Sequence, residues 1–155
     1  MAEVMEERPK VKVPKALDLA IAVIAVLMVV YHLASTQYLV FGPDLHQNVH
    51  FGFALLLVFL SSMRARKRKS WPFYIFLLLV GTGAVIYMQI YHDDIMVRQG
   101  YPITPDLVVG VILIIVAIEA TRQSWGIILP IVTIIAILYA FTCQYWPGAF
   151  YHSPY

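Results

Sequence analysis

Five histidines are the side chains of this sequence whose chemistry could bind a metal ion or a haem group. They are His32, His46, His50, His92 and His152. His46 and His50 are four residues apart and would share one face of a helix. Histidines that face each other across a bundle can ligate haem or a metal, but haem ligands usually lie deep in two helices, and only His50 is deep enough. We therefore expect polar side chains near the membrane surface, with no cofactor, metal or catalytic residue in this chain.

Charged residues inside the apolar segments lie near the segment ends. Glu119 and Arg122 are three residues apart, so they can pair with each other or with a neighbouring helix. Asp18 lies near the start of the first apolar segment. Charges within a membrane span are candidates for function, but charges this close to the interface can reach water, and we expect structural ion pairs. The middle of each span is uncharged, which argues against an ion or proton path through this chain.

Three glycines could permit close helix contacts. Gly81 and Gly83 belong to the third apolar segment, and Gly110 belongs to the fourth. Asp106, one turn before Gly110, is a further candidate for helix packing or an ion pair. The other residues of the apolar segments are mostly bulky and would cover every face of each helix. This is typical of helices that face lipid or a partner protein.

The composition favours lipid as the solvent for most of the chain. The 155 residues are 61% hydrophobic and 13% charged, with a mean hydropathy of +0.76, whereas soluble domains carry roughly 25% charged residues. The single Cys143 excludes an internal disulfide and a metal-binding cysteine pair. The sequence contains no glycine-rich phosphate loop and no nucleophile motif. We predict an all-α integral membrane protein that is not an enzyme.

Five apolar segments each approach the roughly 20 residues that a helix needs to cross the hydrocarbon core. We predict a bundle of four to five transmembrane helices, because the fifth segment is short and begins beside a glycine and a proline. The predicted spans are residues 16–33, 45–63, 71–91, 105–122 and 126–142, within a transmembrane domain of residues 16–142. Asp44 and Gln47 have the spacing of a capping box, and Thr104 is the expected N-cap of the fourth span. Residues 1–15 form a polar tail, and residues 143–155 form an aromatic one.

A cationic connection between the second and third spans sets the predicted direction of the chain. Five of the six residues at 64–69 (Arg-Ala-Arg-Lys-Arg-Lys) are cationic, and basic loops stay on the cytoplasmic side of a membrane. The N-terminus is then inside, the connections 35–48 and 92–104 are outside, and the C-terminus is outside. Ten of the eleven Lys and Arg residues become cytoplasmic, the exception being Arg98. The acidic start predicts that the first span stays as an uncleaved anchor.

Several short segments from Asn48 onward occur in the order seen in a known family. They are His50-Phe51-Gly52-Phe53-Ala54, Tyr91, Arg98-Gln99-Gly100, Pro102, Asp106-Leu107-Val108-Val109-Gly110, Glu119-Ala120-Thr121-Arg122, Gly126 and Leu129-Pro130. This order is similar to the small membrane part of TRAP transporters of the TAXI type, which are tripartite secondary transporters that depend on a periplasmic binding protein. The resemblance covers roughly residues 45–150. The chain departs from the family at Thr121, where the family has the first of two arginines, and it ends at Tyr155, about where the large part of a fused permease would begin.

The resemblance implies a scaffold subunit in a bacterial or archaeal cytoplasmic membrane. It would brace a large permease subunit, which would hold the solute and sodium sites, and help to dock the periplasmic binding protein, with no nucleic-acid partner. The transporter would be driven by an ion gradient, usually of sodium. The expected partner contacts are Asp44, His50, Asp93, Asp94 and Arg98, and the expected helix-packing or ion-pair positions are Asp106, Gly110, Glu119 and Arg122. The alternative for the acids is simple solvation of the loops.

Two other functions stay open from the sequence. One is a haem- or quinone-binding membrane anchor of a redox complex, which only the histidines support. The other is a membrane protein with a purely structural role.

Overall fold

The computed structural model describes residues 14–38, 41–147 and 151. The part of the predicted N-terminal tail at 1–13 lies outside the described residues, as do positions 148–150 and 152–155 of the aromatic tail, His152 among them. In the described part the chain is all-α. Its α-helices are α1 (Lys15–Gln37), α2 (Pro43–Ala65), α3 (Trp71–Ile90), α4 (His92–Val97), α5 (Thr104–Trp125) and α6 (Ile128–Thr142), and its 3₁₀ helices are η1 (Arg68–Ser70) and η2 (Cys143–Tyr145).

Five of these helical stretches are long and apolar enough to cross a membrane. They are α1, α2, α3 extended by η1, α5, and α6 extended by η2. The fifth stretch reaches 18 residues only because η2 continues α6 to Tyr145. The prediction of an all-α membrane protein with a bundle of four to five spans is confirmed. By the length and hydropathy of its helices, the chain is a multi-pass membrane protein.

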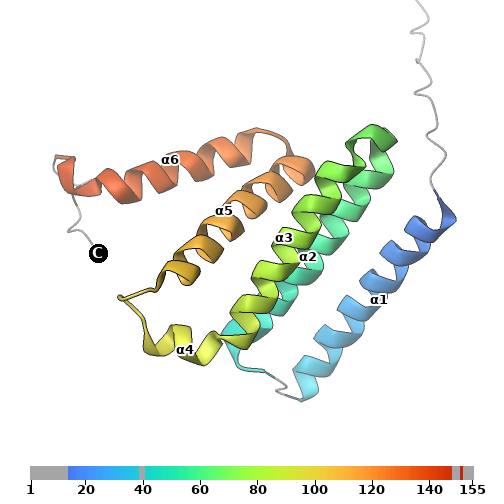
Figure 1. Cartoon of the computed structure of the whole chain (residues 1–155), viewed down its shortest axis with the longest axis horizontal. Coiled ribbons are helices and arrows are strands. Elements are labelled where there is room, and N and C mark those ends of the chain that lie inside the picture. Colours follow the sequence, from blue (N-terminus) through green and yellow to red (C-terminus); the bar gives the residue numbers. More distant parts are fainter. Residues whose placement is uncertain (1–13, 39–40, 148–150, 152–155) are drawn as a thin grey trace, which may run out of the picture.

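Helices α2, α3 and α5 form the centre of the bundle. α2 and α3 lie side by side and antiparallel, and α5 packs against both of them (Figure 1). α1 packs against α2, whereas α6 packs against α5 and diverges from it, so that the C-terminal end of α6 lies apart from the other helices (Figure 1). α1 and α6 are therefore the peripheral helices.

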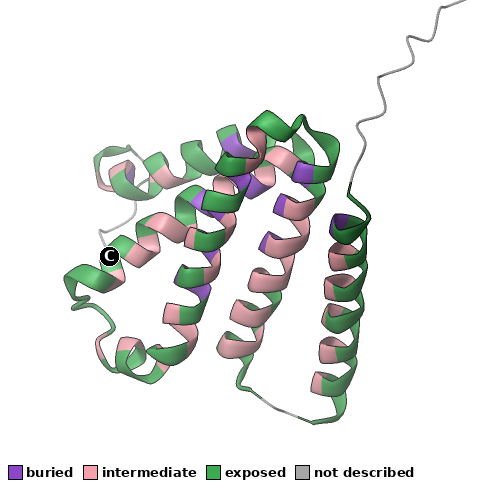
Figure 2. Cartoon of the chain, turned by 45° about the vertical axis from the view of Figure 1, so that its right-hand side comes forward, coloured by how far each residue is buried: buried purple, intermediate pink, exposed green. Residues whose placement is uncertain are grey.

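The buried side chains gather where the three central helices face one another (Figure 2). Phe59 of α2 and Val116 of α5 are fully buried, and Leu77 of α3 belongs to the same cluster. The buried residues of the described part are apolar except for Ser62 and the hydroxyl-bearing Tyr74. Interlocking side chains, rather than a polar interior, therefore hold the middle of the bundle together.

Gly81 lets α3 approach both α2 and α5. A Cβ atom at this position would lie 3.0 Å from Cγ1 of Val116 and 3.2 Å from Cδ1 of Leu55. Outside the local helix, no heavy atom lies within 4 Å of the same position at Gly83 or Gly110. Gly83 is two residues from Gly81 and so lies about 200° around the helix. Of the three glycines considered from the sequence, Gly81 lies at a helix contact within the chain, and Gly83 and Gly110 do not.

The two predicted helix caps were wrong, because both helices begin earlier than the cap patterns suggest. α2 begins at Pro43, with Gly42 as its N-cap, so Asp44 lies in the first turn. Proline suits the first helical position, where its missing N–H group would have had no partner within the helix. α5 begins at Thr104 itself, with Ile103 as the N-cap residue.

Candidate functional site

The polar networks of the described residues lie at the two ends of the helices. We call one the cationic end, made of residues 15–18, 61–71 and 119–126. The other is the histidine end, made of residues 31–38, 41–50 and 85–106. Alternating helix directions place all the residues of each set at one end of the bundle, and the candidate sites follow from these two clusters.

Asp106 is the centre of a network that joins α5 to α3 at the histidine end. Its Oδ1 atom accepts a hydrogen bond of 2.7 Å from the hydroxyl of Tyr87. The guanidinium of Arg98 donates to both carboxylate oxygens at 3.2 Å, and the backbone N–H of Ile103 donates at 3.3 Å. The Asp106 side chain is only 7% exposed. These four donors match the roughly four lone-pair sites of a carboxylate, so Asp106 acts as a structural clasp within the chain.

The connection between α4 and α5 directs Arg98 toward this clasp. The backbone N–H of Arg98 donates to the carbonyls of Asp94 and Ile95, both at 3.1 Å, where α4 ends. Gly100 then has φ +87°, a conformation that glycine adopts without strain. Arg98 was expected to contact a periplasmic partner. Its guanidinium is engaged by Asp106 instead, and a partner contact there stays a prediction.

Asn48 links α2 to α3 beside this clasp. Its side-chain amide donates to the carbonyl of Val85 and to Oε1 of Gln89, both at 2.9 Å. No contact was predicted from the sequence for Asn48, Gln89 or Tyr87, although polar side chains in apolar helices commonly bond across helix interfaces. The isolated amides of Asn48 and Gln89 were the signal that could have identified this contact.

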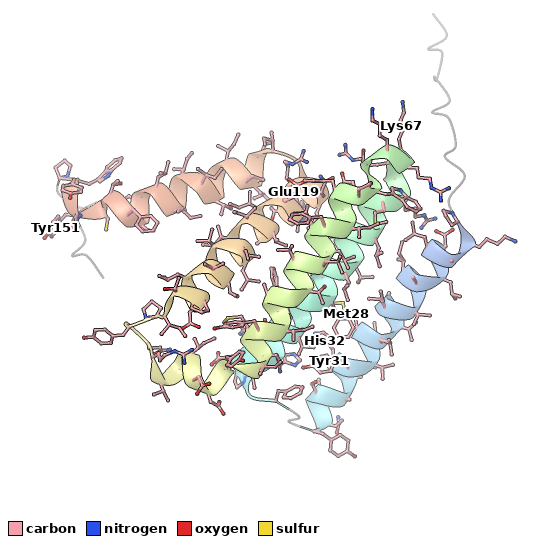
Figure 3. The ribbon with its side chains drawn as sticks, viewed as in Figure 1. Met28, Tyr31, His32, Lys67, Glu119 and Tyr151 are labelled. Atoms are coloured by element: carbon pink, nitrogen blue, oxygen red, sulfur yellow. The ribbon has the colours of Figure 1, made fainter. Side chains whose placement is uncertain are left out.

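Three of the histidines meet between α1 and α2. Nδ1 of His50 lies 2.9 Å from Nε2 of His32, and the ring centroids of His32 and His46 are 5.1 Å apart. Nδ1 of His32 lies 2.6 Å from the carbonyl of Met28, which can only accept a hydrogen bond. In a neutral His32 ring, Nδ1 is therefore the donor, and Nε2 accepts from Nδ1 of His50. The Tyr31 hydroxyl lies 3.1 Å from Nδ1 of His46. Figure 3 shows Met28, Tyr31 and His32 in the C-terminal half of α1, on the side that faces α2.

The facing nitrogens of this cluster bond to each other directly. Two imidazoles on one tetrahedral metal ion would place their nitrogens roughly 3.3 Å apart, since each bond is about 2.0 Å. Among the described residues, no group of three or more His, Cys, Asp or Glu side chains is arranged to hold a metal ion. A pocket of about 280 Å³ lies beside the cluster, lined by His32, Ser35, Thr36, Phe41, Pro43 and His46. Haem or quinone binding, as in the membrane anchor of a redox complex, stays a prediction, and this pocket would be its site.

The three acids expected to contact a partner lie at the same end of the bundle. Asp44 lies in the first turn of α2, and Asp93 and Asp94 lie in the first turn of α4. All three are exposed, and none forms an ion pair with another described residue. They are available to water or to a partner, in contrast to Asp106.

Two ion pairs lie at the cationic end. Asp18 of α1 pairs with Arg64 of α2 at 3.0 Å, with both side chains about half exposed. Arg122 donates to both carboxylate oxygens of Glu119 at 2.7 Å, and the side chain of Gln123 donates to the same carboxylate. The first pair joins two helices, whereas the second stays within α5.

The comparisons with known proteins assign no family to this chain. No protein-family model, curated protein or solved structure matches it. The resemblance to the small part of TRAP transporters therefore rests on the order of the sequence segments alone. The geometry itself gives a multi-pass helical membrane protein with an apolar middle and a polar cluster at each end.

Proposed function

We propose that this chain is the small scaffold subunit of a binding-protein-dependent secondary transporter of the TRAP type. The observation that carries the proposal is the distribution of polar groups. The networks lie at the two ends of the helices, whereas Leu55, Phe59 and Val116 fill the middle of the bundle. Transport sites are built from polar groups, charges or broken helices near the centre of the membrane. The solute and the coupling ion, which we expect to be sodium, would therefore cross the membrane through a separate large permease subunit.

The peripheral helix α6 is the part that we propose packs against the large permease. Among the other long helices it contacts mainly α5, and much of its apolar surface is left uncovered by this chain. Ile128 and Phe141 are more than 70% exposed at its two ends. Along the C-terminal half of α6 lies a groove of about 500 Å³ with an almost wholly apolar lining, made by Ile135, Leu138, Tyr139, Thr142 and Trp146. In lipid, helices associate through close van der Waals packing, and a grooved face offers more contact than a smooth one.

The orientation that we propose puts the cationic end in the cytoplasm, because basic connections are retained on that side. The histidine end then faces the periplasm. Asp44, Asp93 and Asp94 would present an exposed acidic surface there, which a binding protein with a basic surface could recognise. Charges at the rim of an interface mainly raise the association rate and fix the orientation of the partner.

The double substitution Asp93→Lys and Asp94→Lys tests the docking part of this proposal. We expect the binding protein to associate several-fold more slowly with the assembled complex, and the difference to shrink at high salt, because exposed charges are screened. Association rates on immobilised complex would give the measurement. Gln99→Lys, which adds a positive charge at an exposed position of the same connection, is the control. Unchanged association at low salt, with the large permease still co-purifying, would remove these two acids from the docking surface.

A further inference from the structure

We propose that the pocket between α2 and α5 at the cationic end binds the phosphate headgroup of an anionic phospholipid. The pocket has a volume of about 460 Å³. It is lined by Leu57, Val58, Ser61, Ser62, Ala65, Arg66, Gln123 and Ser124. The lining changes along α2 from apolar side chains nearer the middle of the bundle to hydroxyl and guanidinium groups at its end. A phospholipid has the same order of groups, with an acyl chain in the hydrocarbon and a phosphate at the interface.

Arg66 supplies a positive charge that forms no ion pair with an acid of the described residues. Its guanidinium donates to the side-chain oxygen of Gln123 at 3.2 Å, and that amide is neutral. The carboxylate of Glu119 is already bonded to Arg122 through both oxygens and to Gln123. Because a guanidinium carries five N–H donors, most donors of Arg66 remain available. A phosphate can accept two of them side by side.

The surroundings of the pocket favour an anion over a zwitterion. Lys67, Arg68 and Lys69 follow Arg66 directly and are exposed. Figure 3 shows Lys67 and Glu119 at the same end of the bundle. Arg64 has its own partner in Asp18, so the cations beside the pocket outnumber the acids. Basic pockets between transmembrane helices on the cytoplasmic side are suited to acidic headgroups.

The apolar half of the pocket distinguishes a lipid from a free phosphate ion. Leu57 and Val58 would contact an acyl chain, and burying that chain adds a contribution that a soluble anion lacks. The proposal does not depend on the role in transport, since a lipid site would serve any membrane protein. Its failure would leave the scaffold proposal untouched.

The test measures lipid binding to the purified full chain in a neutral detergent. Native mass spectrometry would compare dioleoylphosphatidylglycerol with dioleoylphosphatidylcholine for the unaltered chain and for the Arg66→Gln and Lys69→Gln variants. We expect the phosphatidylglycerol to bind more tightly than the phosphatidylcholine. Its affinity should fall about tenfold or more in Arg66→Gln, as expected for a lost charge-assisted hydrogen bond. Lys69→Gln removes the same charge outside the pocket lining and should retain most of the affinity.

Four outcomes would overturn the proposal. An equal loss of phosphatidylglycerol affinity in Arg66→Gln and Lys69→Gln would mean that the lipid is attracted by the overall positive charge of residues 64–69 and not by a defined site. Equal binding of the two lipids would mean that the headgroup charge is not recognised. Displacement of phosphatidylglycerol by inorganic phosphate at equal concentration would mean a site for a free anion. A Ser124→Leu variant, which narrows the pocket without changing charge, should also weaken phosphatidylglycerol binding, and unchanged binding would count against occupation of the pocket.

Discussion

Gly81→Leu is expected to lower the midpoint of thermal denaturation of the purified chain by several degrees. A Cβ atom at Gly81 would already lie 3.0 Å from Val116 and 3.2 Å from Leu55, and the larger side chain would force α3 away from α2 and α5. Overpacking of this kind costs about 1–3 kcal/mol. Val116 is 1% exposed and Leu55 is 3% exposed, so both neighbours are packed inside the bundle. Fluorescence-detected size exclusion after heating would measure the change.

Gly83→Leu is the matched control for this prediction. It makes the same substitution in the same helix, but no heavy atom outside the local helix lies within 4 Å of the new Cβ position. Leucine also stabilises a helix relative to glycine, by up to about 1 kcal/mol, so the Gly83→Leu variant should be as stable as the unaltered chain or slightly more stable. If the two variants denatured at the same temperature, the packing of α3 against α2 and α5 described above would be incorrect.

Asp106→Asn is expected to loosen the connection between α3 and α5. The change keeps the size of the side chain and one acceptor oxygen, which can still accept from the Tyr87 hydroxyl. It removes the negative charge that holds Arg98 and replaces the second acceptor oxygen with an amide donor. An arginine that is only 27% exposed would then lack its ion-pair partner, and losing one member of a largely buried pair is more harmful than losing an exposed pair. We expect faster amide hydrogen exchange in residues 91–104, together with a lower thermal midpoint.

Asp93→Asn gives the comparison for Asp106→Asn. Asp93 lies in the same region and undergoes the same chemical change, but its side chain is exposed and pairs with no described cation. Surface substitutions of this type usually change stability by less than about 0.5 kcal/mol. Tyr87→Phe should fall between the two, because it removes one of the four bonds to Asp106. Equal exchange rates for the Asp106 and Asp93 variants would show that the clasp does not hold the connection.

The helical spans could be predicted from the sequence because each depends only on a local run of apolar residues. The first residue of a helix could not be predicted in the same way, because several adjacent residues can each begin or cap the helix. Pro43 can begin a helix without a donor partner, and it moved the start of α2 ahead of Asp44. At α5, Asp106 bonds back to Ile103, so the helix includes Thr104.

Contacts between helices were beyond the sequence alone because they depend on how each helix is rotated. Gly81, Gly83 and Gly110 are all glycines within apolar segments, and the sequence does not distinguish them. Of the three, only Gly81 faces a neighbouring helix. The pairing of His32 with His50 requires a defined register between α1 and α2. Tyr87 and Asp106 are 19 residues apart. Their hydrogen bond could be predicted only from the path of the α4 connection, which brings α5 back beside α3.

Purification of the tagged chain from its native membrane tests the scaffold role most directly. Gentle solubilisation would be followed by mass spectrometry of the co-purifying proteins and by measurement of their stoichiometry. The scaffold role predicts one large, many-span permease in fixed ratio to this chain. Redox enzyme subunits in its place would contradict the scaffold role and make the histidine cluster a candidate ligand site. Recovery of the chain alone from intact, gently solubilised membranes would contradict both functions.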